Sequence, residues 1–294
     1  MTLSVVVPVR DGARLVGEAV RALVTEVAAV DGEVVVVDDA SADTTVEEAE
    51  ASGARVLTAG ARVGPYAARN LGWAAARHDA IAFVDARCRP RPGWARQLLA
   101  PLDDAAVALV AGEVVVRSGP TVAARTAHQL QPLRLAEAAS APFLPYAPTC
   151  HLLARRAAIE AVGGFAEVRG GGDVDLCWAV QHAGLGELRP APEAVLEWVP
   201  RETVTALREQ YGRYGRNYGR LATAWAPLGC PRPSAPSPWR AGLHELRRPA
   251  TSGRPPVVAL AAAACRASFA AGLRQGLGEH DTALGPDSAR PAER

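Results

Sequence analysis

Short apolar runs alternate with amphipathic segments through the first hundred residues. Strands are predicted where β-branched residues follow one another without charge, and helices where apolar residues recur every three or four positions. This alternation predicts an α/β fold built on a Rossmann-like, mostly parallel sheet. The predicted strands are 3–9, 33–37, 54–58 and 80–84, and the predicted helices are 16–27, 44–52, 65–76 and 93–102.

The alternation becomes less regular beyond residue 105. A strand is expected at 107–116, followed by helices at 152–162 and 173–183. Prolines, serines and arginines at 226–256 indicate a loose linker, and alanines then predict a C-terminal helical extension at 257–278. The polar segment 279–294 is typical of a disordered tail. These features predict one domain at 1–225, with an N-terminal half at 1–105 and a second half at 106–225.

The composition excludes several classes of protein. The chain has 294 residues, 49% of them hydrophobic, so it can bury a substantial core, and its net charge of +1 gives no general attraction to nucleic acid. Five cysteines lack CxxC spacing, which argues against a zinc site or a disulfide framework and favours a reducing cytoplasm. No signal peptide precedes the first strand. The longest apolar run, 257–265, is about half of what a bilayer needs, so an integral membrane protein is not expected.

Acidic residues follow two of the predicted strands directly. Asp38 and Asp39 come after 33–37, and Asp85 comes after 80–84, with Arg87 two residues later. Ligands of open α/β sheets bind beyond the carboxyl ends of the strands, so these side chains should line a shared crevice. Carboxylates there suit a ligand with hydroxyls, a base edge and a cation-bound phosphate. This pattern indicates a nucleotide-sugar site.

Six motifs then appear in a characteristic order: V-V-V-P-V-R, V-V-V-D-D-A-S, G-P-Y-A-A-R-N-L-G, A-F-V-D-A-R-C-R-P, R-R-A-A-I-E-A-V-G-G-F and G-G-D-V-D-L-C-W. Over about residues 3–222 the chain resembles the inverting family 2 glycosyltransferases. The resemblance implies the GT-A fold, in which a nucleotide-sugar half is joined to an acceptor-binding half. It implies transfer of a hexose from a nucleoside-diphosphate sugar to an acceptor hydroxyl.

The same resemblance implies roles for individual residues. Asp173 matches the general base that takes the proton of the acceptor hydroxyl, and Asp85 matches the first acid of the D-x-D motif, which touches ribose or a metal. Asp39 would bind the base or ribose. The remaining donor-binding positions are Pro8, Val9, Arg10, Arg69 and Arg87, and the acceptor-side positions are His151, Gly172, Gln210 and Arg213.

Three positions depart from the family pattern. Arg87 replaces the second D-x-D acid, Gly172 replaces the acid before Asp173, and Trp198 lies near the place of a metal-binding histidine. Asp85 alone would hold Mg²⁺ or Mn²⁺ weakly. We therefore expect that no cation is required, or only a weakly bound one, and that the Arg87 guanidinium stabilises the leaving diphosphate.

Other interpretations remain open at this stage. A catalytically degenerate nucleotide-sugar binder or partner subunit would have the same motifs. A dinucleotide-dependent oxidoreductase is disfavoured because no G-x-G-x-x-G follows the first strand. Asp38 and Asp39 could cap turns. The tyrosines and arginines of 210–220 suit an acceptor, nucleic acid or anionic lipid, or a surface helix with its tyrosines packed inward. The acceptor could be a small molecule, a polysaccharide or a lipid-linked sugar, in which case the protein would be peripheral to a membrane. The sequence does not indicate the oligomeric state.

Overall fold

The protein consists of two compact units. The computed structural model describes residues 2–168, 170–247, 255–279 and 281–286. Within these, residues 2–115 and 133–198 form the first unit, and residues 116–132 and 199–286 form the second. The two units therefore differ from the expected halves, 1–105 and 106–225. The segment 116–132 belongs to the same unit as the C-terminal helices. Most of the expected tail lies outside the described residues.

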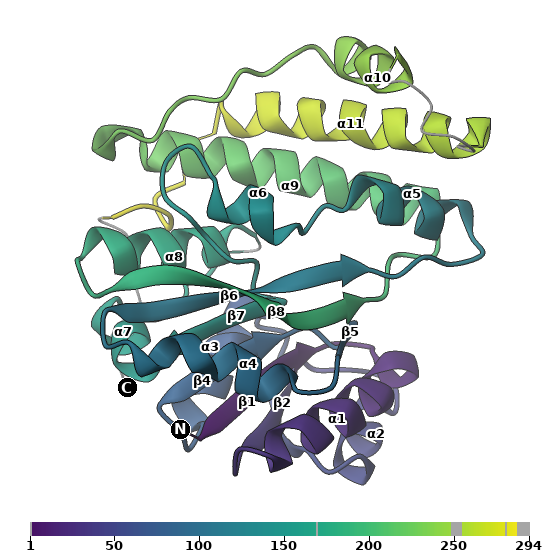
Figure 1. Ribbon diagram of the computed structural model, residues 1–294. Coiled ribbons are helices and arrows are strands. Elements are labelled where there is room, and N and C mark those ends of the chain that lie inside the picture. The colour runs from purple at the N-terminus through teal and green to yellow at the C-terminus, as the bar shows by residue number, and fades with distance from the viewer. Residues whose placement is uncertain (1, 169, 248–254, 280, 287–294) are drawn as a thin grey trace. The chain divides into compact units, whose positions relative to one another are not determined.

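A mixed eight-stranded sheet, in the order β3-β2-β1-β4-β7-β6-β8-β5, forms the centre of the first unit (Figure 1). β1 pairs in parallel with β2 and β4, and β2 pairs in parallel with β3. β7 is antiparallel to β4 and β6, and β5 is antiparallel to β8. The strands are β1 (Leu3–Val9), β2 (Glu33–Asp38), β3 (Arg55–Thr58), β4 (Ala80–Val84), β5 (Cys88–Pro90), β6 (Val107–Val116), β7 (His151–Arg155) and β8 (Glu187–Trp198).

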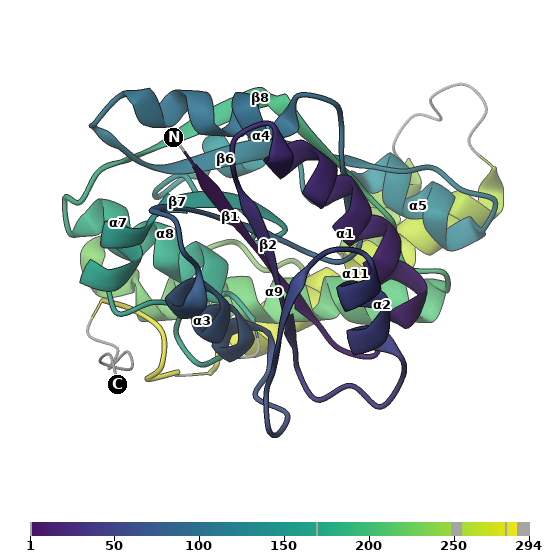
Figure 2. The ribbon, with the colours of Figure 1, turned by 90° about the horizontal axis from the view of Figure 1, so that it is seen from below.

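Helices cover the parallel part of this sheet. Val6 of β1 and Phe83 of β4 belong to the buried cluster that includes Trp73 of α3. The residues directly before and after them in each strand point to the opposite face of the sheet. α1 packs on β1 and β2 and lies beside α2 (Figure 2). The helices of this unit are α1 (Ala13–Ala28), α2 (Thr45–Ala51), α3 (Pro65–Ala75), α4 (Trp94–Leu99), α6 (Leu135–Ala139), α7 (Arg156–Ala161) and α8 (Gly172–His182), with a 3-10 turn, η1 (Ala100–Asp103).

One expected helix of the first unit is wrong. Residues 152–162 form strand β7 and then the short helix α7. Leu152 and Leu153 pair with both β4 and β6, so two neighbouring strands satisfy their backbone groups. Tertiary pairing of this kind overrides a local preference for helix.

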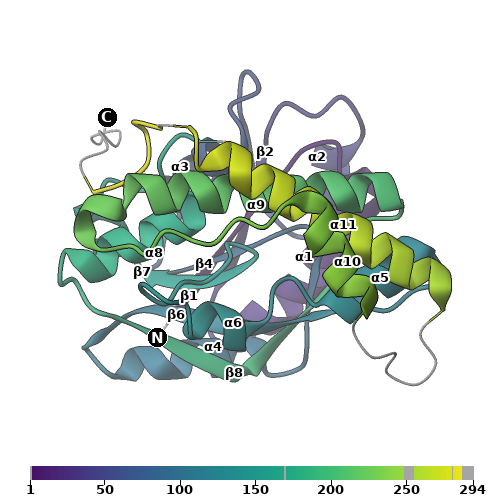
Figure 3. The same cartoon turned by 90° about the horizontal axis from the view of Figure 1, so that it is seen from above.

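Helices make up most of the second unit (Figure 3). α11 packs against α5, α9 and α10. α10 lies inside the segment 226–256, so the expected linker is wrong there. Prolines surround this segment in the sequence, and they obscure the amphipathic pattern of a short helix. The elements are α5 (Val122–Leu130), α9 (Val204–Ala224), η2 (Ala226–Leu228), α10 (Pro238–Arg247) and α11 (Pro256–Gly276).

α9 and α11 approach each other unusually closely. A Cβ atom added at Gly215 would lie 2.0 Å from the carbonyl oxygen of Phe269, and one added at Gly272 would lie 2.0 Å from that of Gly212. Small residues permit this backbone contact. In the described part of the chain, α11 is also the one helix whose length and apolar composition would allow it to cross a membrane, although 44% of its most apolar window is buried. The sequence-based estimate of the apolar length was too short because Arg266 interrupts the run.

Candidate active site

Three side chains of helix α3 form hydrogen bonds with other elements of the first unit. Tyr66 reaches α8, Arg69 reaches the end of β4, and Asn70 reaches the turn after α7. The side-chain amide of Asn70 donates to the carbonyl oxygen of Phe165 at 2.9 Å, and its oxygen accepts from the Phe165 amide at 2.9 Å. The spacing of these residues places them on adjacent turns of one helix. α3 therefore holds the elements that carry the predicted site residues.

Asp173 lies in the first turn of α8, where the helix dipole favours a negative charge. Its Oδ1 atom accepts a hydrogen bond from the Tyr66 hydroxyl at 2.9 Å, and its Oδ2 atom accepts from the Thr149 amide at 3.2 Å. Burial, and next the negative charge of Asp173, raises the pKa of Tyr66 well above its ordinary value, so the phenol stays protonated and donates. These two bonds fix the orientation of the carboxylate.

Two glycines precede this aspartate. Gly171 precedes the helix in the left-handed conformation with φ of 89°. A Cβ atom at Gly172 would lie 3.1 Å from atoms of the Tyr66 ring. The acid that the family pattern has at position 172 would therefore press against Tyr66.

Asp85 lies at the carboxyl end of β4 and forms an ion pair with α3. Nη2 of Arg69 lies 2.7 Å from Oδ1 of Asp85, and the guanidinium carbon of Arg69 lies 5.3 Å from the centroid of the Tyr66 ring. The side chain of Arg69 is only 5% exposed, whereas that of Asp85 is 38% exposed. Arg87 follows in a turn closed by a 2.8 Å hydrogen bond from the Cys88 amide to the Asp85 carbonyl, and it is partly exposed. Asp85 therefore has a buried guanidinium as its partner, and Arg87 lies two residues further along the same turn.

The two acids after β2 make contacts with the backbone. Oδ1 of Asp39 accepts from the Val63 amide at 2.6 Å, and Oδ2 accepts from the Gly64 amide at 3.1 Å. Asp38 accepts from the Ser41 amide at 3.1 Å. Both side chains are nearly buried. Asp39 therefore fixes the loop that leads into α3.

The end of β1 adjoins this loop. The Asp39 amide donates to the carbonyl oxygen of Val9 at 2.8 Å. Pro8 is partly exposed, Val9 is buried, and Arg10 is exposed with an ion pair of 3.4 Å to Asp11. The structure thus brings the predicted nucleoside residues of β1 and β2 together.

His151 has partners for both ring nitrogens inside the first unit. Its Nε2 atom accepts from the Trp94 indole at 2.7 Å, and its Nδ1 atom lies 3.0 Å from the Glu113 carbonyl oxygen, which assigns the proton to Nδ1. The side chain is fully buried, and burial lowers its pKa to about 3. This environment contradicts an acceptor-side role, because a neutral, enclosed imidazole cannot reach a substrate. The sequence could not reveal the Trp94 partner.

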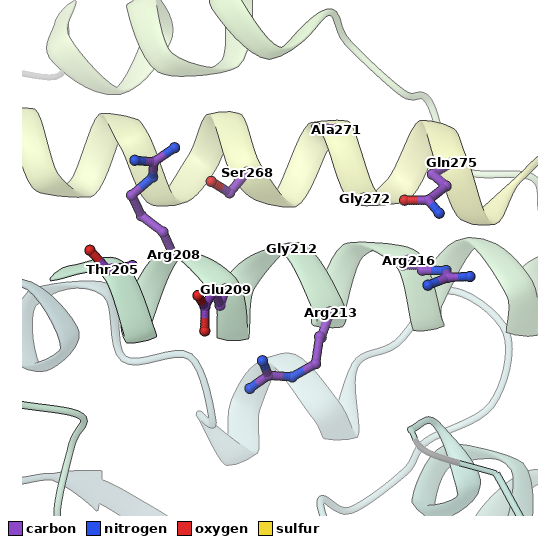
Figure 4. Close-up of a pocket in the computed structure, with 10 residues that line it drawn as sticks. All are labelled: Thr205, Arg208, Glu209, Gly212, Arg213, Arg216, Ser268, Ala271, Gly272 and Gln275. Atoms are coloured by element: carbon purple, nitrogen blue, oxygen red, sulfur yellow. The ribbon is translucent and has the colours of Figure 1, made fainter. Parts of the chain in front are cut away.

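The two remaining acceptor-side candidates belong to α9 in the second unit. Gln210 is buried, and its side-chain amide donates to the Tyr214 hydroxyl. Arg213 is exposed and lines a groove of about 550 Å³ between α9 and α11 (Figure 4). Arg208, Arg216 and Glu209 also line it, which makes this groove predominantly basic.

Sequence reasoning missed two residues of the site, Tyr66 and Asn70. Both lie within the quoted motif G-P-Y-A-A-R-N-L-G, but no role was assigned to them. The available signal was their spacing from Arg69, three positions before it and one after. This spacing puts Tyr66 and Asn70 one turn apart on the helix.

The donor set does not match a dedicated divalent-cation site. In the described ranges, no group of three or more histidine, cysteine or acidic side chains is arranged to hold a metal ion. One oxygen of Asp85 is already bonded to Arg69, and arginine stands at position 87. Mg²⁺ is normally held by one or two carboxylates together with phosphates.

The family of the chain follows from comparison with known proteins. The model of glycosyl transferase family 2 matches residues 4–163, so the chain belongs to this family. The pre-mycofactocin glycosyltransferase of Mycobacterium tuberculosis is 38% identical over 247 residues, which are 80% of this chain and 49% of the relative. The chain thus spans about half the length of the curated relatives it matches.

Solved structures establish the fold class. A mannosyltransferase of Pyrobaculum calidifontis, PcManGT, in complex with GDP-Man and Mn²⁺, gives a TM-score of 0.66 at 20% identity, covering 94% of this chain and 87% of that chain. Glucosyl-3-phosphoglycerate synthase of Mycobacterium tuberculosis, in complex with Mn²⁺, UDP-Glc and phosphoglyceric acid, gives 0.55 at 24% identity, covering 80% and 82%. The expected α/β fold of the GT-A type is confirmed.

Proposed function

We propose that this glycosyltransferase moves a hexose from a nucleoside-diphosphate sugar to an acceptor hydroxyl with inversion at the anomeric carbon. In this reaction Asp173 takes the proton of the acceptor hydroxyl as its oxygen attacks the sugar. The anomeric carbon–oxygen bond to the diphosphate breaks in the same step. The nucleoside diphosphate leaves with the bonding electron pair.

The observation that carries this proposal is the connection between Asp173 and Asp85. Tyr66 and Arg69 lie one helical turn apart on α3, and each holds one of these acids by a hydrogen bond, of 2.9 Å and 2.7 Å. The carboxylate that would accept a proton and the strand end that would meet the donor are therefore fixed by one helix. A transfer reaction needs this joint positioning of two substrates.

The positive charge needed by the leaving diphosphate is assigned to Arg69 and Arg87. The charge on the departing phosphates grows in the transition state and requires preorganised cations or hydrogen-bond donors. Guanidinium groups match phosphate geometry with two parallel N–H donors. Asp85 orients Arg69 through their 2.7 Å ion pair. This arrangement supports a reaction with a weak cation requirement or none.

The nucleoside is assigned to the edge formed by β1, β2 and the loop before α3. Pro8, Val9 and Arg10 supply the end of β1, and Asp39 holds the Val63–Gly64 backbone beside it. Asp39 thereby shapes the donor site. The nucleoside, the sugar and the acceptor depend on loops and stay unassigned.

Asp173→Asn tests the catalytic base. The amide keeps the shape and the Thr149 contact but cannot take a proton, so we expect turnover to fall by about 10³-fold while donor binding is retained. Release of nucleoside diphosphate from UDP-, GDP- and dTDP-sugars measures turnover, and a thermal shift measures binding. Asp79→Asn, at an almost fully exposed aspartate, is the matched control. Full activity in Asp173→Asn would contradict the assignment.

Arg87→Ala tests the role of the guanidinium. We expect about a 100-fold loss of turnover, comparable to the loss of one transition-state donor, and activity of the unchanged protein in EDTA. Arg91→Ala, at an exposed arginine paired with Glu197, is the control. Activity that disappears in EDTA and returns with Mn²⁺ would assign the diphosphate to a metal ion instead. Donor binding without any turnover in every variant and in the unchanged protein would favour the non-catalytic alternative.

A further inference from the structure

The charge of the chain is divided unequally between the two units. The net charge of the whole sequence is only +1. The second unit, residues 116–132 and 199–288, contains 14 arginines and 6 acidic residues, so its net charge is +8. The first unit is correspondingly acidic. A neutral total therefore conceals a strongly basic unit, which attracts anionic surfaces.

Exposed apolar side chains also concentrate in this unit. Seven large apolar residues of the described chain are strongly exposed, and four of them belong to the α10–α11 hairpin. Trp239 and Leu246 lie on α10 and are 64% and 44% exposed, and Val257 and Leu260 lie on α11 and are 49% and 61% exposed. Single exposed apolar residues are ordinary, but a group on one pair of helices needs an explanation.

The side chains of α10 separate into stripes. Gly242 and Glu245 face α11, as the close approach of Gly242 to Ala263 and the ion pair of Glu245 with Arg266 show. Helical geometry places Trp239, Leu243 and Leu246 on a second stripe. Arg240, His244 and Arg247 form a third stripe beside the apolar one. The Arg240 guanidinium lies 5.2 Å from the centroid of the Trp239 ring.

α10 and α11 run in opposite directions. Arg274 of α11 donates to the carbonyl oxygen of Ala235, just before α10, whereas Arg266 pairs with Glu245 near its end. The C-terminal end of α10 therefore lies toward the N-terminal end of α11, where Val257 and Leu260 are located (Figure 3). The hairpin accordingly carries apolar residues from both helices together with a row of basic ones.

The exposed apolar and basic side chains of the α10–α11 hairpin favour one kind of partner. A second copy of this surface would bring two basic surfaces together, and like charges oppose such a symmetric contact. Nucleic acid would use the arginines and Trp239 but leaves aliphatic side chains without a role. An anionic bilayer uses all of them: tryptophan at the headgroup level, aliphatic residues at the acyl boundary and arginines with the lipid phosphates.

We infer that the α10–α11 hairpin binds this protein to the surface of membranes that contain anionic phospholipids. Trp239, Leu246, Val257 and Leu260 enter the interface, and Arg240 and Arg247 pair with the headgroups. This docking does not depend on the sugar transfer reaction. It would bring the enzyme to the surface where lipid-linked or other membrane-bound acceptors are found.

Sedimentation of the full chain with lipid vesicles tests the inference. We expect vesicles with about 30% phosphatidylglycerol to bind the protein at least about tenfold more tightly than pure phosphatidylcholine, and this preference to weaken with salt. The double variant Trp239→Ser, Leu260→Ser should lower binding to the anionic vesicles by about tenfold. Arg240→Gln with Arg247→Gln should lower it by about 25-fold, because each arginine near an anionic leaflet contributes about fivefold.

Leu185→Ser is the matched control, since Leu185 is 40% exposed in the first unit. It should bind vesicles as the unchanged protein does, and thermal unfolding should show that every variant is folded. The inference is overturned if the unchanged protein ignores anionic vesicles, or if the double variant binds no more weakly than Leu185→Ser. It is also overturned if Trp239→Ser converts a dimer to a monomer, or if an oligonucleotide binds more tightly than vesicles and is unaffected by that variant. Because vesicle binding is measured without turnover, this result is separate from the outcome of Asp173→Asn.

Discussion

At the scale of single residues, Tyr66 is the side chain on which the site depends most. Its hydroxyl donates to Asp173, its ring lies against Gly172, and the Arg69 guanidinium lies over that ring. Aromatic rings attract cations placed over their faces. The same residue therefore supports the proposed base, the start of α8 and the arginine that orients Asp85.

Tyr66→Phe separates the hydroxyl from the ring. The Asp173 carboxylate loses one of the two donors that orient it, so we expect release of nucleoside diphosphate to slow by about tenfold while donor binding is retained. The ring remains, so stability should change little. Tyr218→Phe in the second unit is the control. Turnover equal to that of the unchanged protein would show that the hydroxyl does not act on the proposed base.

Individual roles were only partly predictable from the sequence. The motif order points to Asp85 and Asp173, because these residue types are tied to fixed positions in the family, and their roles stay predictions. The pairing of Asp85 with Arg69 could not be foreseen, since it links two segments that are distant in sequence. His151 was misjudged for the same reason, because Trp94 and Glu113 come from other elements.

At the scale of elements, the pairing of α9 with α11 organises the second unit. The glycines of the two helices allow backbone contact without side chains between them. Such packing depends on steric space rather than on the area of apolar side chains buried. Two neighbouring glycines of α9 respond differently to a methyl group, which makes the packing testable.

Gly215→Ala should destabilise the protein by about 2 to 3 kcal/mol, because its Cβ atom would lie 2.0 Å from the Phe269 carbonyl oxygen and the helices would have to separate. Gly212→Ala meets its nearest atom at 3.7 Å and should be neutral or stabilise by about 0.5 kcal/mol. Chemical denaturation measures both. Equal effects of the two substitutions would contradict the proposed close contact.

Elements were predicted well where local pattern and tertiary pairing agree. The strands of the parallel half, Leu3–Val9 and Ala80–Val84, match the expected ranges because their apolar runs leave no alternative. The helix at 152–162 failed because β4 and β6 recruit its first residues into the sheet. α10 was missed because a proline-rich neighbourhood masks three turns of amphipathic pattern.

At the scale of the whole molecule, the stability of the chain depends on pH through its buried histidine. The pKa of His151 falls from 6.5 to about 3 on folding because burial disfavours the imidazolium. The unfolded chain binds a proton that the folded chain does not bind between these two values. Stability from this group is therefore complete above about pH 6.5 and decreases as the pH falls toward 3.

The expected loss at pH 4 is about 3 kcal/mol relative to neutral pH, at about 1.4 kcal/mol for each pKa unit. His151→Gln retains an acceptor for the Trp94 indole and removes the titrating group. This variant should be less stable at pH 7 yet show a flatter dependence on pH. Denaturation curves from pH 7 to pH 4 measure the difference between the slopes, and parallel slopes would rule out this origin of acid sensitivity.

The hydrogen bonds that three side chains of α3 form with other elements have a consequence for substrate selection. A helix of three turns is stiff along its axis, so the bonds that Tyr66, Arg69 and Asn70 form cannot loosen independently. The distance between Asp173, the proposed proton acceptor, and the carboxyl end of β4 is thereby set before any substrate binds. Selectivity would come from how well the length of the transferred group fits that preset distance, and an ill-fitting sugar would meet a frame that does not yield.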